Sequence, residues 1–448
     1  MMFKKIFSMI LQLTIAFLFL VSAAVAQNAN DSIGLLDAVS LAIKTDNNLA
    51  GSKQNIMAAD QGIRSAKGAY YPKLSLSGSY SHLSKTSEIS IAIPGVGEHK
   101  IQTNTENPFN TSLAANWDVY TFGRRSAMVG IAGQDRQTSQ LGYDFTRKQL
   151  FDNVARSYLL NVYAQASYDL VQAEKNRFLK IYNLAEERYQ QALMSEFDLL
   201  QLQLRLKRYE LTTVELENNL QTARVNLAEL LGINSDDLPE LSDNFDKVIL
   251  DLPEYRDDTN ILLNRDDYNQ ALSRSESARL AGKVRKSTYF PNVSLFSAYD
   301  FRNGYQPDLD DVEGNFTVGV NFSWLLFDGF SRCAELEKQN YIWKSSTYYA
   351  DDLKSIIPTQ VKSARLAMAN SRTKIELGQK TLEVAGKAMS IAQTRYDLGD
   401  ISMIELLEAE NNLAEAELGL LQLNYQLLLA ELNLKVAAGY YPELDSLN

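Results

Sequence analysis

The sequence predicts an α+β membrane protein in which one unit of helices and strands occurs twice. Residues 188–232 and 395–439 are identical at 14 of 45 positions without a gap, 207 residues apart. Four short stretches alternate apolar and polar residues, the pattern of strands with one apolar face. Two long runs, from about 123 to 188 and from about 332 to 395, have the composition of helices. A duplicated unit with these elements follows from the three observations together.

The first 26 residues have the pattern of a secretory signal peptide. Lys4 and Lys5 precede an apolar run that ends in Ala24-Val25-Ala26, an A-x-A cleavage pattern. A membrane anchor is the alternative for this segment. Gln27, where a lipoprotein would have cysteine, argues against lipid attachment. We therefore expect the mature chain to leave the cytoplasm.

Composition excludes several classes of protein. The net charge is −11, and removal of Lys4 and Lys5 with the signal peptide makes it −13, which disfavours nucleic acid as a partner. The single cysteine, Cys333, permits no internal disulfide. After residue 26 no apolar run approaches the ~20 residues of a spanning helix, so membrane insertion would require strands. We find no arrangement of residues typical of an enzyme or of a cofactor site.

The repeat sets the expected domain boundaries. Repeat 1 spans 27–232, an equatorial connector spans 233–264, repeat 2 spans 265–439, and a tail spans 440–448. Trp117 and Trp324 keep the offset of 207, whereas Tyr71-Pro72 and Phe290-Pro291 differ by 219. The first copy therefore has 12 extra residues between Pro72 and Trp117, which predicts a tolerant loop there.

Each repeat begins with a helix and continues with a hairpin. The helices, expected over 35–69 and 265–288, end at an aromatic-Pro step, which biases the preceding residue away from helix. The hairpins are expected at about 72–121 and 291–327. Their apolar faces are predicted to hold alternate residues: Leu74, Leu76, Gly78 and Tyr80; Leu113, Ala115, Trp117 and Val119; Val293, Leu295, Tyr299 and Phe301; Phe316, Val318, Val320, Phe322, Trp324 and Leu326.

Each repeat ends with a pair of long helices, expected at about 123–232 and 330–439. Between the two helices of each pair stand RYQQALMSEFDLL, from Arg188, and RYDLGDISMIELL, from Arg395. The small residues Ala192 and Gly399 suit a tight turn. Ser195 and Ser402 stand where a helix N-cap is expected, three residues before an acid.

Four strands cannot close a barrel, and open strand edges do not survive in lipid. Several chains must therefore share one barrel, and three chains would supply twelve strands. Aromatic residues gather at one end of the strands, as in a membrane-interface girdle; they are Tyr71, Trp117, Tyr120, Phe290, Trp324 and Phe327. A soluble sandwich with aromatic edges is the alternative, but it leaves the long helices unexplained.

These features together resemble the TolC-like outer membrane efflux proteins, or outer membrane factors, over nearly all of the mature chain. The resemblance is carried by the paired RYxx[GA]xxSxx[DE]LL phrases, the strand ends WDVYTFGRR (117–125) and WLLFDGF (324–330), and the endings VNLAELLGI (225–233) and LNLKVAAGY (432–440). It implies a homotrimer with a twelve-stranded barrel in the outer membrane of a Gram-negative bacterium. It also implies a coiled-coil helical tunnel across the periplasm and an equatorial collar.

The resemblance also assigns roles to the repeated phrases. The two helix turns of each chain would form the periplasmic mouth, closed at rest and opened on docking. The residues of this gate are Arg188, Tyr189, Ser195, Asp198, Arg395, Tyr396, Gly399 and Ser402. Tyr396 and Asp198 fall on positions that form hydrogen bonds between neighbouring turns. Ile401 departs from the family pattern, which has an arginine there, so the latch is differently built.

Glu405 and Glu408 fall on the family's acidic entrance rings, which line the mouth and bind cations. Their i, i+3 spacing puts both on one helix face. No permanent metal is expected, only inhibitory cations at these rings; compensation of the helix dipole is the alternative role of Glu405.

The function implied is that of the outer membrane exit duct of a tripartite efflux or type I secretion system. Its partners would be a periplasmic adaptor protein, an inner-membrane pump and outer membrane lipid. Two alternatives remain at this stage, a secreted or surface-attached coiled-coil structural protein and an enzyme that uses the barrel as an anchor. Sequence does not separate drug efflux, metal efflux and protein secretion.

Overall fold

The computed structural model describes residues 32–95, 97–242 and 261–442. The predicted signal peptide, residues 243–260 of the predicted connector and residues 443–448 of the predicted tail lie outside these ranges. The chain divides into two units, which are described separately. The bundle unit comprises Met1–Ala50, Phe145–Arg265 and Ile356–Asn448, and the sheet unit comprises Gly51–Asp144 and Asp266–Ser355.

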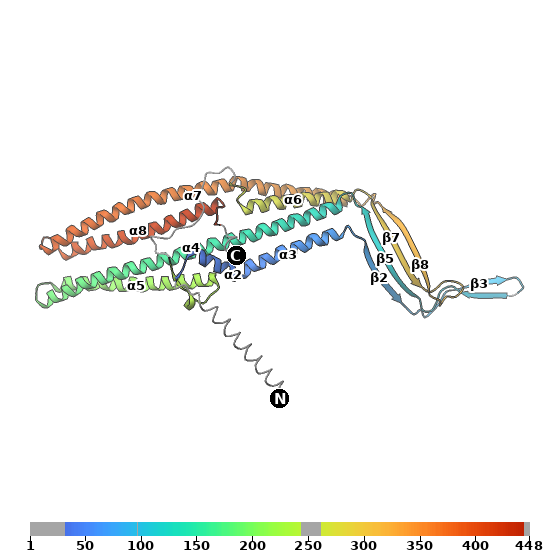
Figure 1. Cartoon of the computed structure of the whole chain (residues 1–448), viewed down its shortest axis with the longest axis horizontal. Coiled ribbons are helices and arrows are strands. Elements are labelled where there is room, and N and C mark those ends of the chain that lie inside the picture. Colours follow the sequence, from blue (N-terminus) through green and yellow to red (C-terminus); the bar gives the residue numbers. More distant parts are fainter. Residues whose placement is uncertain (1–31, 96, 243–260, 443–448) are drawn as a thin grey trace, which may run out of the picture. The chain divides into compact units, whose positions relative to one another are not determined.

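The sheet unit contains six strands, four of which form one sheet, together with the whole of one helix and parts of three others (Figure 1). The helices are α3 (Asn47–Gly68), α4 (Arg124–Gln190), α6 (Asp266–Ser287) and α7 (Ser331–Asp397), and the strands of this sheet are β2 (Lys73–Tyr80), β5 (Phe109–Tyr120), β7 (Asn292–Arg302) and β8 (Glu313–Ser323). Helices α3 and α6 end three residues before the aromatic residue of their aromatic-Pro step, as the sequence predicts.

The four strands form one antiparallel sheet in the order β2-β5-β7-β8. Its register aligns the predicted apolar faces, since Leu76 pairs with Leu113, Leu113 with Tyr299 and Tyr299 with Phe316. The period-two pattern therefore predicts the common face of all four strands. A bulge between Asp118 and Tyr120 interrupts the register near one end of β5.

The apolar face of the sheet is open in the chain. Leu76 is 74 % exposed and Val318 is 68 % exposed. Strands β2 and β8 are the edges of the sheet, and neither pairs with another strand among the described residues. An uncovered apolar face this large, with two unpaired edges, marks a surface made for another apolar environment and for further strands.

The extra residues of the first copy form a second hairpin rather than an unstructured loop. Strand β3 (Glu88–Ile93) pairs antiparallel with β4 (Gly97–Gln102). The reason lies in the segment EISIAI, which alternates polar and small residues with isoleucine. Side chains tie its base to the connection between β7 and β8, where Thr105 Oγ1 donates a hydrogen bond to Asp310 Oδ1 over 2.5 Å.

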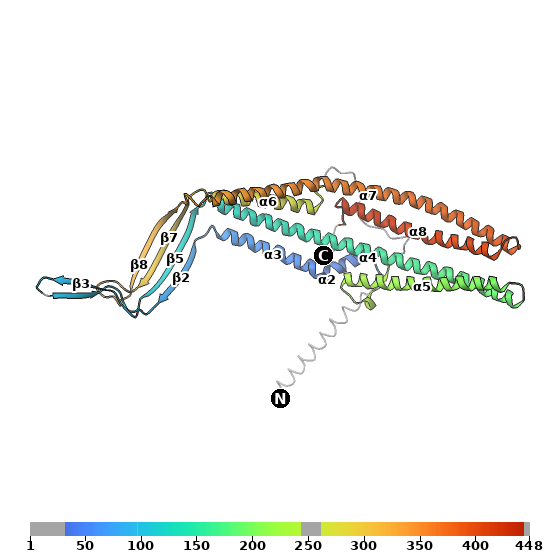
Figure 2. The same cartoon turned by 180° about the vertical axis from the view of Figure 1, so that it is seen from behind.

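The bundle unit is built from two helix pairs and a small parallel strand pair (Figure 2). Its own elements are α2 (Leu35–Thr45), α5 (Glu196–Leu231), the 3-10 helix η1 (Ser235–Asp237) and α8 (Met403–Ala437), with strands β1 (Ser32–Ile33) and β6 (Glu240–Leu241). Apart from these it holds the later parts of α4 and α7, and α7 continues through Pro358 without a break. No described helix is both long enough and apolar enough to cross a bilayer.

The helix expected over 35–69 is divided in two. Asp46 is extended (φ −70°, ψ 114°) and ends α2. Its carboxylate accepts a hydrogen bond from the backbone N–H of Leu49 and so caps α3. Aspartate favours this local capping bond over a helix interior, which explains why helical composition alone failed to predict the interruption.

Candidate gate at the two helix turns

The two repeated phrases fold into turns of the same type. The N–H of Ala192 donates to Tyr189 O and that of Leu193 to Arg188 O, both over 2.9 Å. In the second turn Gly399 donates to Tyr396 O over 3.0 Å and Asp400 to Arg395 O over 2.8 Å. This is the Schellman arrangement, in which the residue after the helix is left-handed. The ends of α4 and α7 are thus capped by hydrogen bonds to backbone carbonyl groups, those of Arg188 and Tyr189 in the first turn and those of Arg395 and Tyr396 in the second.

The two turns differ at the left-handed residue. Ala192 has φ +63° and Gly399 has φ +78°. A Cβ atom in this region costs about 1–2 kcal/mol, and glycine avoids the cost. Ala192→Gly is therefore expected to raise the melting temperature slightly, whereas Gly399→Ala lowers it. Melting curves of both variants beside the parent protein test this, and equal shifts in one direction would contradict it.

The serines of the phrases are N-caps, as predicted. Ser195 Oγ accepts a hydrogen bond from Asp198 N over 3.1 Å, and Ser402 Oγ accepts one from Glu405 N over 3.3 Å. At Ser402 the capping box is complete, because Glu405 Oε2 accepts from the Ser402 backbone N–H over 2.8 Å. These bonds fix the first turns of α5 and α8.

The capping box also determines the charge of Glu405. The hydrogen bonds from the Ser402 backbone and hydroxyl groups hold the pKa of this carboxyl below its usual value, and the nearby Arg395 acts in the same direction. Glu408 lies one turn further along α8 and is exposed. Within the chain the Glu405 carboxyl group therefore favours its ionised form. Its predicted role at the start of α8, where it compensates the helix dipole, is present together with the capping box, whatever further role Glu405 and Glu408 have.

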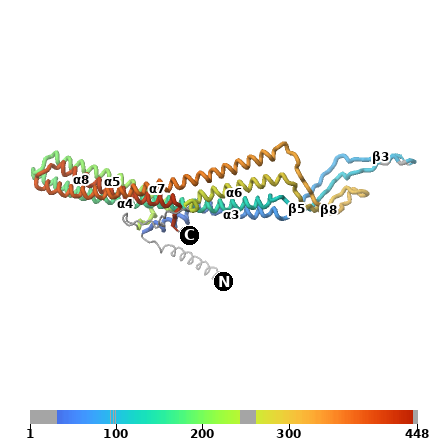
Figure 3. The backbone as a smooth tube through the Cα atoms, turned by 90° about the horizontal axis from the view of Figure 1, so that it is seen from above, coloured from blue at the N-terminus to red at the C-terminus, as the bar shows by residue number. Residues whose placement is uncertain are grey.

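Behind the turns, a hydrophobic cluster joins α4, α5, α7 and α8. Figure 3 shows both turns of the bundle unit at the same end of the helix pairs. Met403 and Leu406 of α8 are buried against Ala185 of α4 and Leu202 of α5, and Tyr396 of α7 packs on this cluster. The two turns of one chain are therefore held together by packing.

Tyr396 lies near Arg188 and Asp198, two other residues of the predicted gate. Partial burial raises the pKa of Tyr396, the Arg188 guanidinium opposes this rise, and the Asp198 carboxylate adds to it. Arg188, Tyr396 and Met403 line a cavity of about 60 Å³. Within the described chain Asp198 is not bonded to Tyr396; its Oδ2 instead accepts from Ser195 Oγ over 2.7 Å.

A polar network above the cluster escaped sequence analysis. Arg205 of α5 forms an ion pair with Glu410 of α8 over 3.2 Å, and the Tyr209 hydroxyl donates to the same carboxylate. The Arg205 guanidinium also lies over the Tyr209 ring, 4.9 Å from its centroid. Because Arg205 and Tyr209 lie on α5 and Glu410 lies on α8, these bonds connect the two helices.

Glu174 of α4 is the buried acid beside this network. Glu174 is only 3 % exposed, and its atom Oε1 has no hydrogen-bond partner among the described residues. Burial, together with the adjacent carboxyl of Glu417, raises the pKa of Glu174 to about 8, against the charge of Arg177. Arg177 itself pairs with Glu417 over 3.1 Å. At neutral pH Glu174 is therefore mostly protonated.

The aromatic residues predicted as a girdle lie in the sheet unit. Trp117 Nε1 donates to Tyr70 O over 2.9 Å, and Trp324 Nε1 donates to Tyr289 O over 3.1 Å. Each tryptophan thus fastens the last strand of its hairpin to the segment before the first. The other predicted members are also exposed: Tyr71, Tyr120, Phe290 and Phe327.

Two arginines complete this fastening and were not singled out from the sequence. Arg125 donates to Ala69 O over 3.3 Å and to Val119 O over 2.6 Å. Arg332 makes the matching bonds to Thr288 O, over 3.1 Å, and to Leu326 O, over 3.2 Å. The signal was available, since Arg125 and Arg332 are also 207 residues apart.

Comparison with known proteins decides the family of this chain. The model of the family "Outer membrane efflux protein" matches residues 38–233 and 259–440. The chain belongs to this family. The resemblance inferred from the repeated phrases and strand ends is thereby confirmed.

Outer membrane efflux proteins similar to this chain differ in their cargo. The alkaline protease secretion protein AprF of Pseudomonas aeruginosa is 22 % identical over 422 residues, covering 92 % of this chain and 86 % of AprF. The cation efflux system protein CusC of Escherichia coli K12 is 23 % identical, covering 77 % and 75 %. The solved CmeC outer membrane channel of Campylobacter jejuni superposes with a TM-score of 0.77 at 20 % identity, over 90 % of this chain and 85 % of CmeC.

The family membership and these relatives establish the general function. The protein is an outer membrane channel for efflux or secretion, and the interpretation as a secreted structural protein is not supported. The family is one of transport channels rather than of enzymes. The roles of the individual gate, ring and girdle residues stay predictions.

Proposed function

We propose that three copies of this chain form one duct through the outer membrane and the periplasm. The observation that carries the proposal is the four-stranded sheet with an exposed apolar face and two unpaired edges, β2 and β8. Three such sheets joined edge to edge make a closed barrel of twelve strands, which leaves no strand edge in lipid. The alternate polar residues then line a wet lumen.

The helix turns of the bundle unit then form the periplasmic mouth. Six turns, two from each chain, surround the opening, and their rigid Schellman and N-cap geometry suits them to packing against one another. Tyr396 and Asp198 of neighbouring chains supply the latch, since within one chain they are not bonded to each other. Docking of an adaptor protein, itself bound to an inner-membrane pump, opens the mouth. Because the relatives CusC and AprF are named for cation efflux and for protease secretion, they do not distinguish which class of pump this chain serves.

Glu405 and Glu408 would form two stacked rings of three carboxylates at this mouth. Crowded carboxylates attract multivalent cations, which prefer oxygen ligands. Because Glu405 also belongs to a capping box, glutamine is the informative replacement: it removes the charge and retains the capping bond.

The test of the proposed function is conductance in planar bilayers. The parent protein is expected to form channels that micromolar to millimolar multivalent cations block from the periplasmic side only. In Glu405→Gln/Glu408→Gln the cation concentration needed for half block is expected to rise at least about tenfold. The free energy of unfolding should stay within about 0.5 kcal/mol of that of the parent, because the cap persists. Exposed Glu383→Gln, on α7, is the matched control. Absence of channels would refute the duct, and an unchanged block would place the cation site elsewhere.

A further inference from the structure

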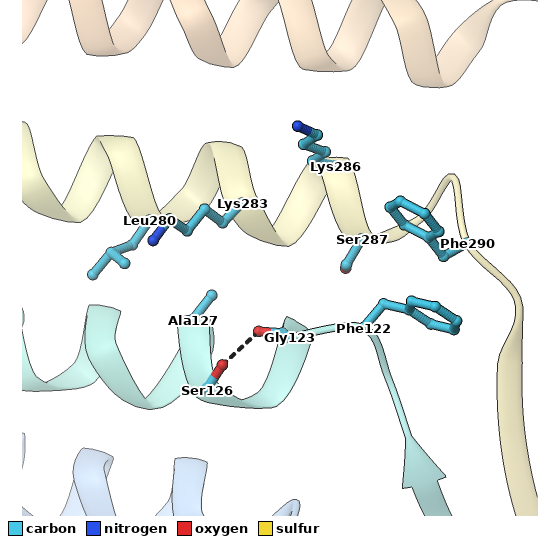
Figure 4. A pocket seen from close by; sticks show the side chains of 9 residues that line it. All are labelled: Phe122, Gly123, Ser126, Ala127, Leu280, Lys283, Lys286, Ser287 and Phe290. Atoms are coloured by element: carbon cyan, nitrogen blue, oxygen red, sulfur yellow. Dashed lines mark hydrogen bonds between the residues drawn. The ribbon is translucent and has the colours of Figure 1, made fainter.

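A pocket of about 400 Å³ lies in the sheet unit between the beginning of α4 and the end of α6 (Figure 4). Ser126 and Ala127 of α4 and the preceding Gly123 form its floor, while Leu280, Lys283 and Ser287 line it from α6. Both helix ends directly adjoin strands of the sheet, α4 following β5 and α6 preceding β7. The pocket therefore stands at the level where the sheet gives way to helices.

One end of the pocket is aromatic. Phe122 and Phe290 stack with their ring centroids 4.8 Å apart and an angle of 10° between their planes. Tyr120 packs edge-on against Phe122 at 4.6 Å, which joins this pair to the predicted girdle. Phe122 adopts φ +46°, a left-handed conformation that is costly for a residue with a bulky side chain. The corresponding residue of the second repeat, Gly329, is also left-handed (φ +66°), so this conformation belongs to the turn between strand and helix.

The other end of the pocket is cationic. Figure 4 shows Lys283 on the side of α6 that faces α4, with Lys286 pointing away from the pocket at its rim. Among the described residues neither lysine has an ion-pair partner within 4.0 Å. The first turn of α4, with its positive dipole end, stands at the aromatic end of the pocket, because Gly123 directly follows Phe122. Figure 4 shows the Lys283 amino group pointing away from that end, toward Leu280, so an anion bound to Lys283 lies at the opposite end of the pocket from the aromatic pair.

The charge of the surrounding sequence reinforces this pocket. Residues 280–292 contain three basic and no acidic residues, and residues 61–73, which correspond under the offset of 219, contain the same numbers. Arg64 and Lys67 stand at the positions of Lys283 and Lys286. The connection at the other end of β7, residues 303–313, has four acidic and no basic residues. The segments that lead into β2 and β7 are therefore basic, whereas the connection from β7 to β8 is acidic.

We propose that this pocket binds the phosphate group of an anionic phospholipid in the leaflet that faces the helices. The proposal rests on the proposed function, because it places the sheet in a membrane. Lys283 receives the phosphate, Lys286 adds long-range attraction, and the Phe122–Phe290 pair contacts the glycerol and the start of an acyl chain at the other end of the pocket. Basic groups next to a membrane-embedded surface bind anionic headgroups in this way, and aromatic rings prefer the same interface.

Lipid binding to the purified, assembled protein in detergent tests the proposal. Titration with short-chain phosphatidylglycerol, followed by native mass spectrometry, gives the affinity of the parent protein and its variants. Each lysine near an anionic headgroup contributes roughly fivefold in affinity, so Lys283→Gln should weaken binding about fivefold and Lys283→Gln/Lys286→Gln up to roughly 30-fold. Exposed Lys374→Gln, in the bundle unit, should bind as the parent does. Equal affinity in the double variant and the parent would overturn the proposal.

Two further experiments distinguish a lipid phosphate from free phosphate. Inorganic phosphate at millimolar concentration is expected not to displace the lipid, since it lacks the part that contacts the aromatic pair. Phe122→Leu should weaken phosphatidylglycerol binding but leave any binding of inorganic phosphate unchanged. Full displacement by inorganic phosphate would refute a lipid site. Conductance of the same preparations separates the two proposals: lipid binding without channels would refute only the duct.

Discussion

Replacing Glu410 by alanine is expected to destabilise the helix bundle by about 2–4 kcal/mol, the largest effect of any single substitution considered for this unit. The carboxylate accepts hydrogen bonds from Arg205 and Tyr209, which come from the facing helix α5. The side chains of Arg205 and Glu410 are only 18 % and 16 % exposed, so water replaces the lost partner poorly. Removal of one partner leaves a desolvated guanidinium group and a hydroxyl group without their acceptor.

Thermal unfolding followed by circular dichroism measures this effect. Glu408→Ala is the matched control, because Glu408 lies on the same helix, is exposed and forms no ion pair among the described residues. Glu410→Gln should fall between the two, since it keeps an acceptor for Tyr209 and loses the charge. Equal melting temperatures for Glu410→Ala and Glu408→Ala would show that the network contributes nothing to stability.

The stability of the bundle is expected to fall as the pH rises from about 5 to 9, because of Glu174. Its pKa is about 8 in the folded chain, above the ordinary value of 4.5. The folded state therefore binds the proton more tightly than the unfolded state does. The resulting stabilisation is complete below the unfolded pKa, declines as the pH rises and is lost above the folded pKa. Its size is on the order of a few kcal/mol.

Glu174→Gln isolates this contribution, because glutamine resembles the protonated acid and does not titrate. The difference in melting temperature between the variant and the parent should be small at pH 5 and should favour the variant increasingly up to pH 9. Glu187→Gln, an exposed position of the same helix, should follow the parent at every pH. A difference that is constant from pH 5 to 9 would show that Glu174 titrates normally.

Much of the sheet could be predicted because its pattern is local and duplicated. Leu76, Leu113, Tyr299 and Phe316 fall on one face as the alternation of each strand requires, and the register then follows from pairing like faces. The same holds for the caps, since Ser195 and Ser402 are set by residues three positions away. The hairpin β3–β4 is not predicted although its isoleucines alternate, because a length difference between two copies indicates only a tolerant insertion and not its conformation.

The network at Glu410 could not be predicted, since its residues are distant in the chain and occur once. Arg205 and Glu410 are separated by 205 positions, and the residue corresponding to Arg205 in the second copy is Asn412. Neither the repeat nor the helical pattern marks such a pair. Packing of α5 against α8 alone brings the two charges together, and only then does burial shift the pKa of Glu174.

The mass of the purified protein in detergent tests the central claim most directly. The chain of 448 residues has a mass of 50.3 kDa, which includes the predicted signal peptide. Light scattering, with the bound detergent subtracted, should give about three times the mass of one mature chain, because only then do the edges β2 and β8 find partners. A particle of one chain whose sheet remains intact would contradict the shared barrel and, with it, the duct.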